Sequence, residues 1–143
     1  MNTTLKPYEH RVQYYETDQM GVVHHSNYIR WFEETRIDYM RQTGIVYKDL
    51  ETAGIIIPVV GVQAEYKART FFDDVVEIYL YNEKYNGVVM ELSYEIKDKE
   101  TGELRCTGRS KHCFINEQGY PCMVKKIEPL FHERFLKMID MLK

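Results

Sequence analysis

The sequence predicts an α+β protein in which an antiparallel sheet is wrapped around one long helix. Residues 27–43 carry an apolar stripe of helical period, and from residue 55 onward the pattern changes to an alternation of period two. Turn signals separate the alternating segments, which favours antiparallel strands. A sheet with one apolar face needs a cover, and the widely apolar helix is the obvious candidate. The 143 residues fit one domain, which we expect to span residues 1–143.

The first part of the chain is predicted to form one strand and the long helix. Residues 8–15 alternate between two faces, which indicates a strand. The helix over 27–43 is preceded by Ser26 and Asn27, either of which is a suitable N-cap, and Gly44 is the expected residue past its end. Its apolar stripe consists of Ile29, Phe32, Arg36/Ile37 and Met40.

An edge strand is predicted next. Residues 59–68 alternate, and Pro58 lies near the start of this run. Because proline cannot donate a hydrogen bond to a ladder, the strand belongs at an edge of the sheet rather than in its centre. The alternation continues over residues 76–80, and Asn86-Gly87 then predicts a type I′ hairpin turn.

The last part of the chain predicts two more strands and a second helix. Residues 88–97 show the clearest alternation in the sequence, "DKETGE" reverses the chain, and residues 104–115 return. Pro129 opens a final helix that is apolar on one side.

Composition excludes several classes of protein. A formal charge of −3 argues against a nucleic-acid partner, and no apolar run is long enough for membrane insertion. The N-terminus has no apolar segment of the kind found in secretory signals. The cysteines, Cys106, Cys113 and Cys122, are odd in number and lack CxxC spacing, which predicts reduced thiols in a cytoplasmic protein and no structural zinc.

A long motif occupies residues 11–36, "RVQYYETDQMGVVHHSNYIRWFEETR". It resembles the N-terminal signature of the 4-hydroxybenzoyl-CoA thioesterase family of hotdog-fold proteins, and most closely the acyl-CoA thioesterase branch associated with the Tol-Pal system. A weaker match follows at 59–74, "VVGVQAEYKARTFFDD". The chain has His24 where many members of this branch carry tyrosine. The shared residues in the first motif are Arg11-Val12, Thr17-Asp18, Gly21-Val22-Val23, His25, Asn27-Tyr28 and Phe32-Glu33.

The resemblance implies an acyl-CoA thioesterase that releases a free carboxylic acid and CoA, without a metal or a bound cofactor. It implies a homodimer, or a homotetramer built from dimers, with active sites at the subunit boundary. Asp18 and the helix start would come from one chain. Tyr66, Lys67 and Arg69 would come from the other chain.

Thioester hydrolysis needs a nucleophile or a base, together with donors for the developing oxyanion. Asp18 can serve as nucleophile or general base, and the helix start near His25–Asn27 offers backbone N–H groups and a positive dipole end. Gly21 supplies the backbone freedom that lets the loop return to the helix. His25 is the second catalytic candidate, which orients Asp18 or contacts the thioester.

Substrate contacts are expected around these groups. Lys67 and Arg69 share one strand face and could meet the phosphates of coenzyme A, whereas Arg109 and Lys111 form a weaker pair. The predicted substrate-binding residues are Gly21, Val23, His24, Asn27, Tyr66, Lys67 and Arg69.

Structural roles compete with each of these assignments. Aspartates before a glycine turn are commonly turn residues, adjacent histidines can simply pack, and basic residues on a strand are usually solvated. Three alternatives to an acyl-CoA thioesterase stay open. These are a thioesterase for acyl carrier protein, a hotdog dehydratase, and a non-catalytic hotdog module that binds acyl-CoA or a partner protein.

Overall fold

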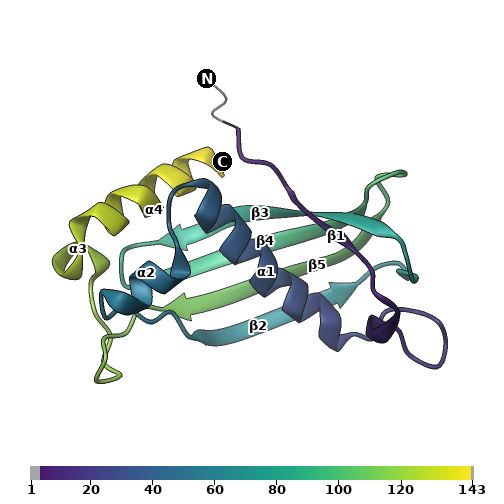
Figure 1. Ribbon diagram of the computed structural model, residues 1–143, viewed down its shortest axis with the longest axis horizontal. Coiled ribbons are helices and arrows are strands. Elements are labelled where there is room, and N and C mark those ends of the chain that lie inside the picture. Colours follow the sequence, from purple (N-terminus) through teal and green to yellow (C-terminus); the bar gives the residue numbers. More distant parts are fainter. Residues whose placement is uncertain (1–3, 143) are drawn as a thin grey trace.

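The computed structural model describes residues 4–142 (Figure 1). Five strands form one sheet, and helix α1 (Ser26–Gln42) lies across one face of it. The remaining elements are β1 (Tyr8–Arg11), the 3-10 helix η1 (Tyr14–Glu16), α2 (Tyr47–Thr52), β2 (Val59–Tyr66), β3 (Val75–Tyr85), β4 (Val89–Asp98), β5 (Leu104–Cys113), α3 (Val124–Ile127) and α4 (Pro129–Met141).

The sheet has the order β1-β3-β4-β5-β2, and all neighbouring strands are antiparallel. The prediction that the strand after Pro58 is an edge strand is confirmed, since β2 pairs only with β5. Almost every residue of β2 is exposed, including Val60 and Tyr66. Of the three inner strands β3, β4 and β5, β4 alternates between buried and half-buried positions over its whole length, as the sequence pattern predicts.

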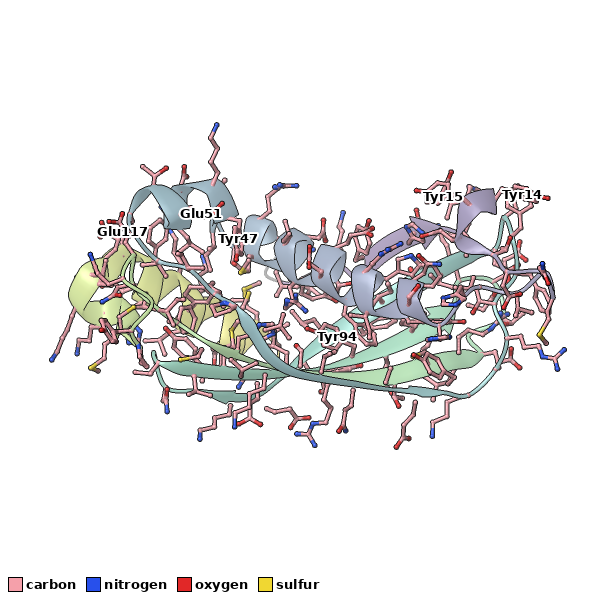
Figure 2. The ribbon with its side chains drawn as sticks, turned by 90° about the horizontal axis from the view of Figure 1, so that it is seen from below. Tyr14, Tyr15, Tyr47, Glu51, Tyr94 and Glu117 are labelled. Carbon is pink, nitrogen blue, oxygen red and sulfur yellow. The ribbon has the colours of Figure 1, made fainter. Side chains whose placement is uncertain are left out.

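The core forms where α1 meets the sheet. Trp31 and Phe32 are fully buried, and the ring of Phe32 stacks on that of Tyr94 in β4 at a centroid distance of 4.3 Å. Helix and strand approach closely here because β5 carries Gly108. A Cβ atom at this position would lie 2.3 Å from Cζ of Phe32. Figure 2 shows Tyr94 between the helix and the sheet.

Two local predictions are wrong. The strand predicted over 8–15 ends at Arg11, because the side chain of Glu16 accepts the N–H of Gln13 and folds the chain into η1. Only Gly87 of the Asn86-Gly87 pair has a positive φ, of 84°, so the turn is not of type I′. The side chain of Asn86 instead accepts the N–H groups of the two residues that lead into β4.

The termini of the helices follow ordinary capping chemistry. Gly44 has a φ of 81° just after α1, as predicted. Glu128 caps α4 by accepting the N–H of Leu130, and Pro129 occupies the first helical position. The short helices α2 and α3 were not predicted, since neither is long enough to show a helical period. No helix within residues 4–142 is long and apolar enough to cross a membrane.

Candidate active site

The loop between η1 and α1 folds back on itself beside the helix start. Thr17 and Val23 form an antiparallel bridge, and the N–H groups of Met20 and Val22 donate to Oδ1 of Asp18 over 2.8 and 3.4 Å. Gly21 has a φ of 78°, a conformation that favours glycine. Asp18 is half-buried in this turn. Its Oδ2 atom has no hydrogen-bond partner in the described part of the chain.

The start of α1 leaves a backbone donor unpaired. The N–H of Ser26 donates to Nδ1 of His24 over 3.2 Å, and that of Asn27 to the carbonyl of His24 over 3.0 Å. The N–H of His25 has no acceptor among residues 4–142. The predicted N-cap was therefore wrong, because the imidazole of His24, rather than the side chain of Ser26 or Asn27, accepts a helical N–H. The unpaired N–H and the positive helix end suit an anionic oxygen.

A cavity of about 240 Å³ lies beside this helix start. Val23 and His25 line it from one side, and Tyr66, Lys67 and Arg69 line it from the other. The hydroxyl group of Tyr66 donates to the carbonyl of His25 over 3.3 Å, so the end of β2 is tied directly to the residue before α1. Five of the predicted site residues are thus neighbours around one cavity.

These five residues belong to the same chain. The expectation that a second chain supplies Tyr66, Lys67 and Arg69 stays a prediction, whereas within one chain these residues already lie beside His25. The reason is the sheet order: β2 is at the edge that passes the N-terminus of α1 (Figure 1).

The other predicted site residues lie close to the cavity without lining it. Asp18 is linked to it through Val22, whose carbonyl accepts the N–H of Asp18 over 2.9 Å. Gly21 is exposed at the tip of the turn. The ring of His24 stacks on that of His25 at 4.1 Å. Asn27 is buried, and its amide donates to the carbonyl of Glu16 over 2.8 Å, which places it within the supporting structure.

The two basic residues at the cavity differ in their ion pairs. Nζ of Lys67 lies 2.9 Å from Oε2 of Glu65, whereas Arg69 forms no ion pair within the described residues. Arg105 holds the segment in place, because its carbonyl accepts the N–H groups of Lys67 and Ala68 and its guanidinium donates to the carbonyl of Arg69. The weaker candidate Arg109 lies 3.6 Å from Glu83, and alternation puts it on the sheet face opposite α1.

Glu16 stabilises the loop and the helix start that form the site. Its carboxylate is 4% exposed and accepts hydrogen bonds from the Gln13 N–H at 2.8 Å and from Nε1 of Trp31 at 2.7 Å, with Nε2 of His10 also at 2.8 Å. Burial raises the pKa of Glu16, but these hydrogen bonds outweigh burial and hold that pKa below its ordinary value. The backbone carbonyl of Glu16 accepts from His24 and Asn27. One residue therefore fixes both the loop and the helix start.

Sequence reasoning missed several members of the site. Val22, Tyr28 and Ala68 line the cavity, and the hydroxyl group of Tyr28 donates to Oγ1 of the buried Thr70 over 3.2 Å. Glu16 was also missed as a supporting residue. In the sequence, Glu16 is only a carboxylate next to Thr17 in a motif rich in aromatic residues. An exposed glutamate would give the same pattern, so the sequence does not reveal that Glu16 is buried.

One long helix laid across a five-stranded antiparallel sheet is the arrangement of the hotdog fold. The model of the Thioesterase-like superfamily matches residues 12–135. The chain belongs to this superfamily and has its hotdog fold.

Relatives agree with this assignment. A Bacillus subtilis protein with the provisional name acyl-CoA thioesterase YneP is 32% identical over 130 residues, which are 90% of this chain and 94% of that protein. The acyl-CoA thioester hydrolase YbgC of Escherichia coli O157:H7 is 30% identical over 100 residues, 70% of this chain and 75% of that protein. A structure of DHNA-CoA thioesterase from Staphylococcus aureus is 36% identical and has a TM-score of 0.88, covering 95% of this chain and 91% of that one.

Proposed function

We propose that the chain is an acyl-CoA thioesterase that hydrolyses an acyl-CoA thioester to a free carboxylic acid and CoA. The observation that carries the proposal is the cavity between the start of α1 and the end of β2, which His25 lines and to which Asp18 is linked through Val22. Membership of a superfamily of thioester hydrolases supports the same reaction class. We assign the cavity to the thioester group.

Asp18 supplies the reactive carboxylate. Its Oδ2 atom accepts no hydrogen bond from residues 4–142, so it is available to a water molecule or to the thioester itself. The N–H of His25 donates to the carbonyl oxygen as negative charge develops there. The imidazole of His25 lines the cavity and orients the reacting groups.

Two routes satisfy the balance of atoms. As a base, Asp18 takes a proton from water while the water oxygen attacks the carbonyl carbon. The carbon–sulfur bond then breaks, and the CoA sulfur leaves with a proton. As a nucleophile, Asp18 attacks the carbon itself, the carbon–sulfur bond breaks, and the CoA sulfur leaves and takes up a proton. Water then cleaves the mixed anhydride into the free carboxylic acid and the Asp18 carboxylate. Turnover in oxygen-18 water separates the routes, since label is expected to enter the Asp18 carboxylate only when an anhydride forms.

Coenzyme A is proposed to contact the end of β2. Arg69 lacks an ion pair among the described residues and lies at the cavity with Lys67, so both cations can meet phosphate oxygens. Tyr66 and Val23 would contact the pantetheine arm, with Gly21, His24 and Asn27 shaping the loop around it. The reaction as proposed uses neither a metal nor a bound cofactor.

Three finer assignments belong to the same proposal. The chain is assigned to the Tol-Pal-associated branch of the 4-hydroxybenzoyl-CoA thioesterase family on the motif at 11–36. A cytoplasmic location is supported by three cysteines that form no disulfide. Assembly as a homodimer, or as a homotetramer of such dimers, is supported by the exposed edge strand β2.

Release of free thiol from a panel of acyl-CoAs tests the function. An enzyme of this kind is expected to turn over at least one short, medium or aromatic acyl-CoA many times. Tight acyl-CoA binding without thiol release would instead support a non-catalytic module. If the same acyl group is hydrolysed much faster on acyl carrier protein than on CoA, the substrate is the thioester bound to acyl carrier protein.

A further inference from the structure

A second cavity lies two turns further along α1. Its volume is about 310 Å³, and it opens between α1, α2 and the start of β2. Its walls are largely apolar, with Ile37 and Met40 from α1, Ile57 from the segment before β2, and Met90 from β4. Arg36 and His112 also line it, and we call this cavity the Arg36 pocket. Figure 2 shows Tyr47 at this end of α1.

A chain of buried hydrogen bonds begins at Arg36. Its Nη1 atom donates to the hydroxyl oxygen of Tyr94 over 3.0 Å. That hydroxyl group lies 2.5 Å from Oγ of Ser110, and Ser110 Oγ lies 2.7 Å from Nε2 of His112. His112 and Tyr94 are both 1% exposed, so each of these polar atoms needs its partner within the protein.

The direction of this chain follows from counting donors. Arg36 can only donate, so the hydroxyl oxygen of Tyr94 accepts from it, and the Tyr94 proton finds its acceptor in Ser110. The Ser110 proton then goes to Nε2 of His112. Burial, together with the Arg36 charge, lowers the pKa of His112 to about 3, so the ring is neutral and its single proton is on Nδ1.

The pocket therefore contains hydrogen-bond donors without acceptors. Nδ1 of His112 has no partner among residues 4–142, although the ring is almost fully buried. Arg36 uses a single N–H toward Tyr94 and has no carboxylate within 4.0 Å in the described residues. Glu33 lines the pocket as well, but it is exposed and forms no ion pair with Arg36. Apolar walls that end in a cation and a neutral N–H fit an apolar group that ends in an oxygen acceptor.

We propose that the Arg36 pocket binds the far end of the acyl group and selects acyl groups that end in an acceptor oxygen, a carboxylate or a hydroxyl. This inference rests on the proposed thioesterase function. Both cavities are lined by residues of α1 and of β2. Tyr28 at the first cavity and Arg36 are eight residues apart on α1, which corresponds to about 12 Å. An acyl group of medium length spans a distance of this order.

Matched pairs of acyl-CoAs test the selection. Decanoyl-CoA is compared with 10-hydroxydecanoyl-CoA and with the CoA monothioester of decanedioic acid, which differ from it only at the terminal carbon. We expect kcat/KM to favour the oxygen-bearing member of a pair by about tenfold, the effect of one hydrogen bond to a charged group. Arg36→Met is expected to remove this preference while decanoyl-CoA turnover stays within a few-fold. Arg36→Lys, which keeps the cation, should retain part of it. Arg41→Met, at an exposed position of α1, is the matched control.

Direct binding separates this inference from the proposed function. Hexanoate and hexylammonium, which has the same chain but no acceptor oxygen, are titrated against protein with labelled histidine, and the Nδ1 signal of His112 is followed by NMR. Hexanoate, and not hexylammonium, is expected to shift the signal in wild type and in Arg41→Met, but not in Arg36→Met. Hexanoate binding of this kind in a protein that hydrolyses no thioester would uphold the pocket and overturn the thioesterase. Hydrolysis without terminal-oxygen preference, or with a preference that Arg36→Met leaves unchanged, would overturn the pocket.

Discussion

Two carboxylates lie two residues apart in the N-terminal loop, and their surroundings differ. Glu16 is buried and fully engaged by Gln13, His10 and Trp31. Asp18 is half-buried and accepts hydrogen bonds on one oxygen only. A carboxylate with hydrogen bonds on both oxygens stabilises the fold, whereas one with an unbonded oxygen can react. This contrast assigns support to Glu16 and chemistry to Asp18.

Replacing Glu16 by Gln is expected to destabilise the protein by about 3 kcal/mol at neutral pH, because a buried partner is removed from His10. The amide also presents N–H groups toward the N–H groups of Gln13 and Trp31, which are themselves donors. Urea unfolding measures the change, with the exposed Glu100→Gln as control. Equal stability of both variants would contradict the supporting role.

The same substitution should change how stability depends on pH. Because folding lowers the pKa of Glu16, its stabilisation is complete above the ordinary value of 4.5 and is lost as the pH falls through the lower folded value. Wild type should therefore lose stability in this acidic range more steeply than Glu16→Gln. Parallel curves would show that the carboxylate contributes no linked stability.

The two adjacent histidines are expected to separate activity from stability. His25 lines the cavity, so His25→Ala should lower kcat/KM by about tenfold or more and alter the pH–rate profile. His24 accepts the N–H of Ser26, so His24→Ala should instead cost about 1 kcal/mol of stability, as a lost cap does. Rates and urea unfolding are measured for both variants. Equal and small effects on the rate would show that neither imidazole matters to the chemistry.

At the scale of elements, the packing of α1 on β5 depends on a glycine. Gly108→Ala would put a methyl group against the Phe32 ring and 3.1 Å from the carbonyl oxygen of Gln63. Overpacking of this kind is expected to cost about 2 kcal/mol and to move the helix away from the sheet. Gly61→Ala on the edge strand is the control, since its nearest contact would be 3.9 Å away. A stability for Gly108→Ala equal to that of the control would refute this account of the contact.

Regular patterns predicted the main elements. The apolar stripe of α1 and the alternation of β4 each extend over many residues, so single exceptions do not hide them. Short elements gave no such signal. The 3-10 helix η1 forms because the Glu16 side chain reaches Gln13, a tertiary hydrogen bond that alternation cannot reveal. The prediction of a type I′ turn at Asn86-Gly87 was wrong for a related reason. The side chain of Asn86 accepts the N–H groups of Val88 and Val89 and stabilises a different turn.

The sequence predicted only in part which segments lie close together in the site. The motif at 11–36 pointed to the loop and the helix start, and the segment after β2 was identified by its basic residues. Their meeting in one chain depends on the sheet order, which the sequence pattern did not supply. Arg36 was visible as a charge on an apolar stripe, but its link to His112 passes through Tyr94 and Ser110 on two different strands.

At the scale of the molecule, the exposed edge strand predicts association. Val60, Val62 and Tyr66 of β2 are 57%, 41% and 50% exposed, and the backbone groups of β2 that face away from β5 form no ladder. Pairing with a two-fold copy would satisfy these groups and cover the apolar side chains. Sedimentation equilibrium, with activity followed on dilution, is expected to show a dimer or tetramer that loses activity as it dissociates. A stable monomer with full specific activity would contradict this prediction.

The most direct test of the proposed enzyme is the rate of CoA release by Asp18→Asn on the best acyl-CoA substrate. The amide has the size of the carboxylate and can still accept the N–H groups of Met20 and Val22, so the circular dichroism spectrum should stay unchanged. Without basicity or nucleophilicity, kcat should fall by a factor of at least about 100, whereas the exposed control Asp49→Asn should retain full activity. Near-normal turnover by a folded Asp18→Asn protein would contradict the assignment of the active site.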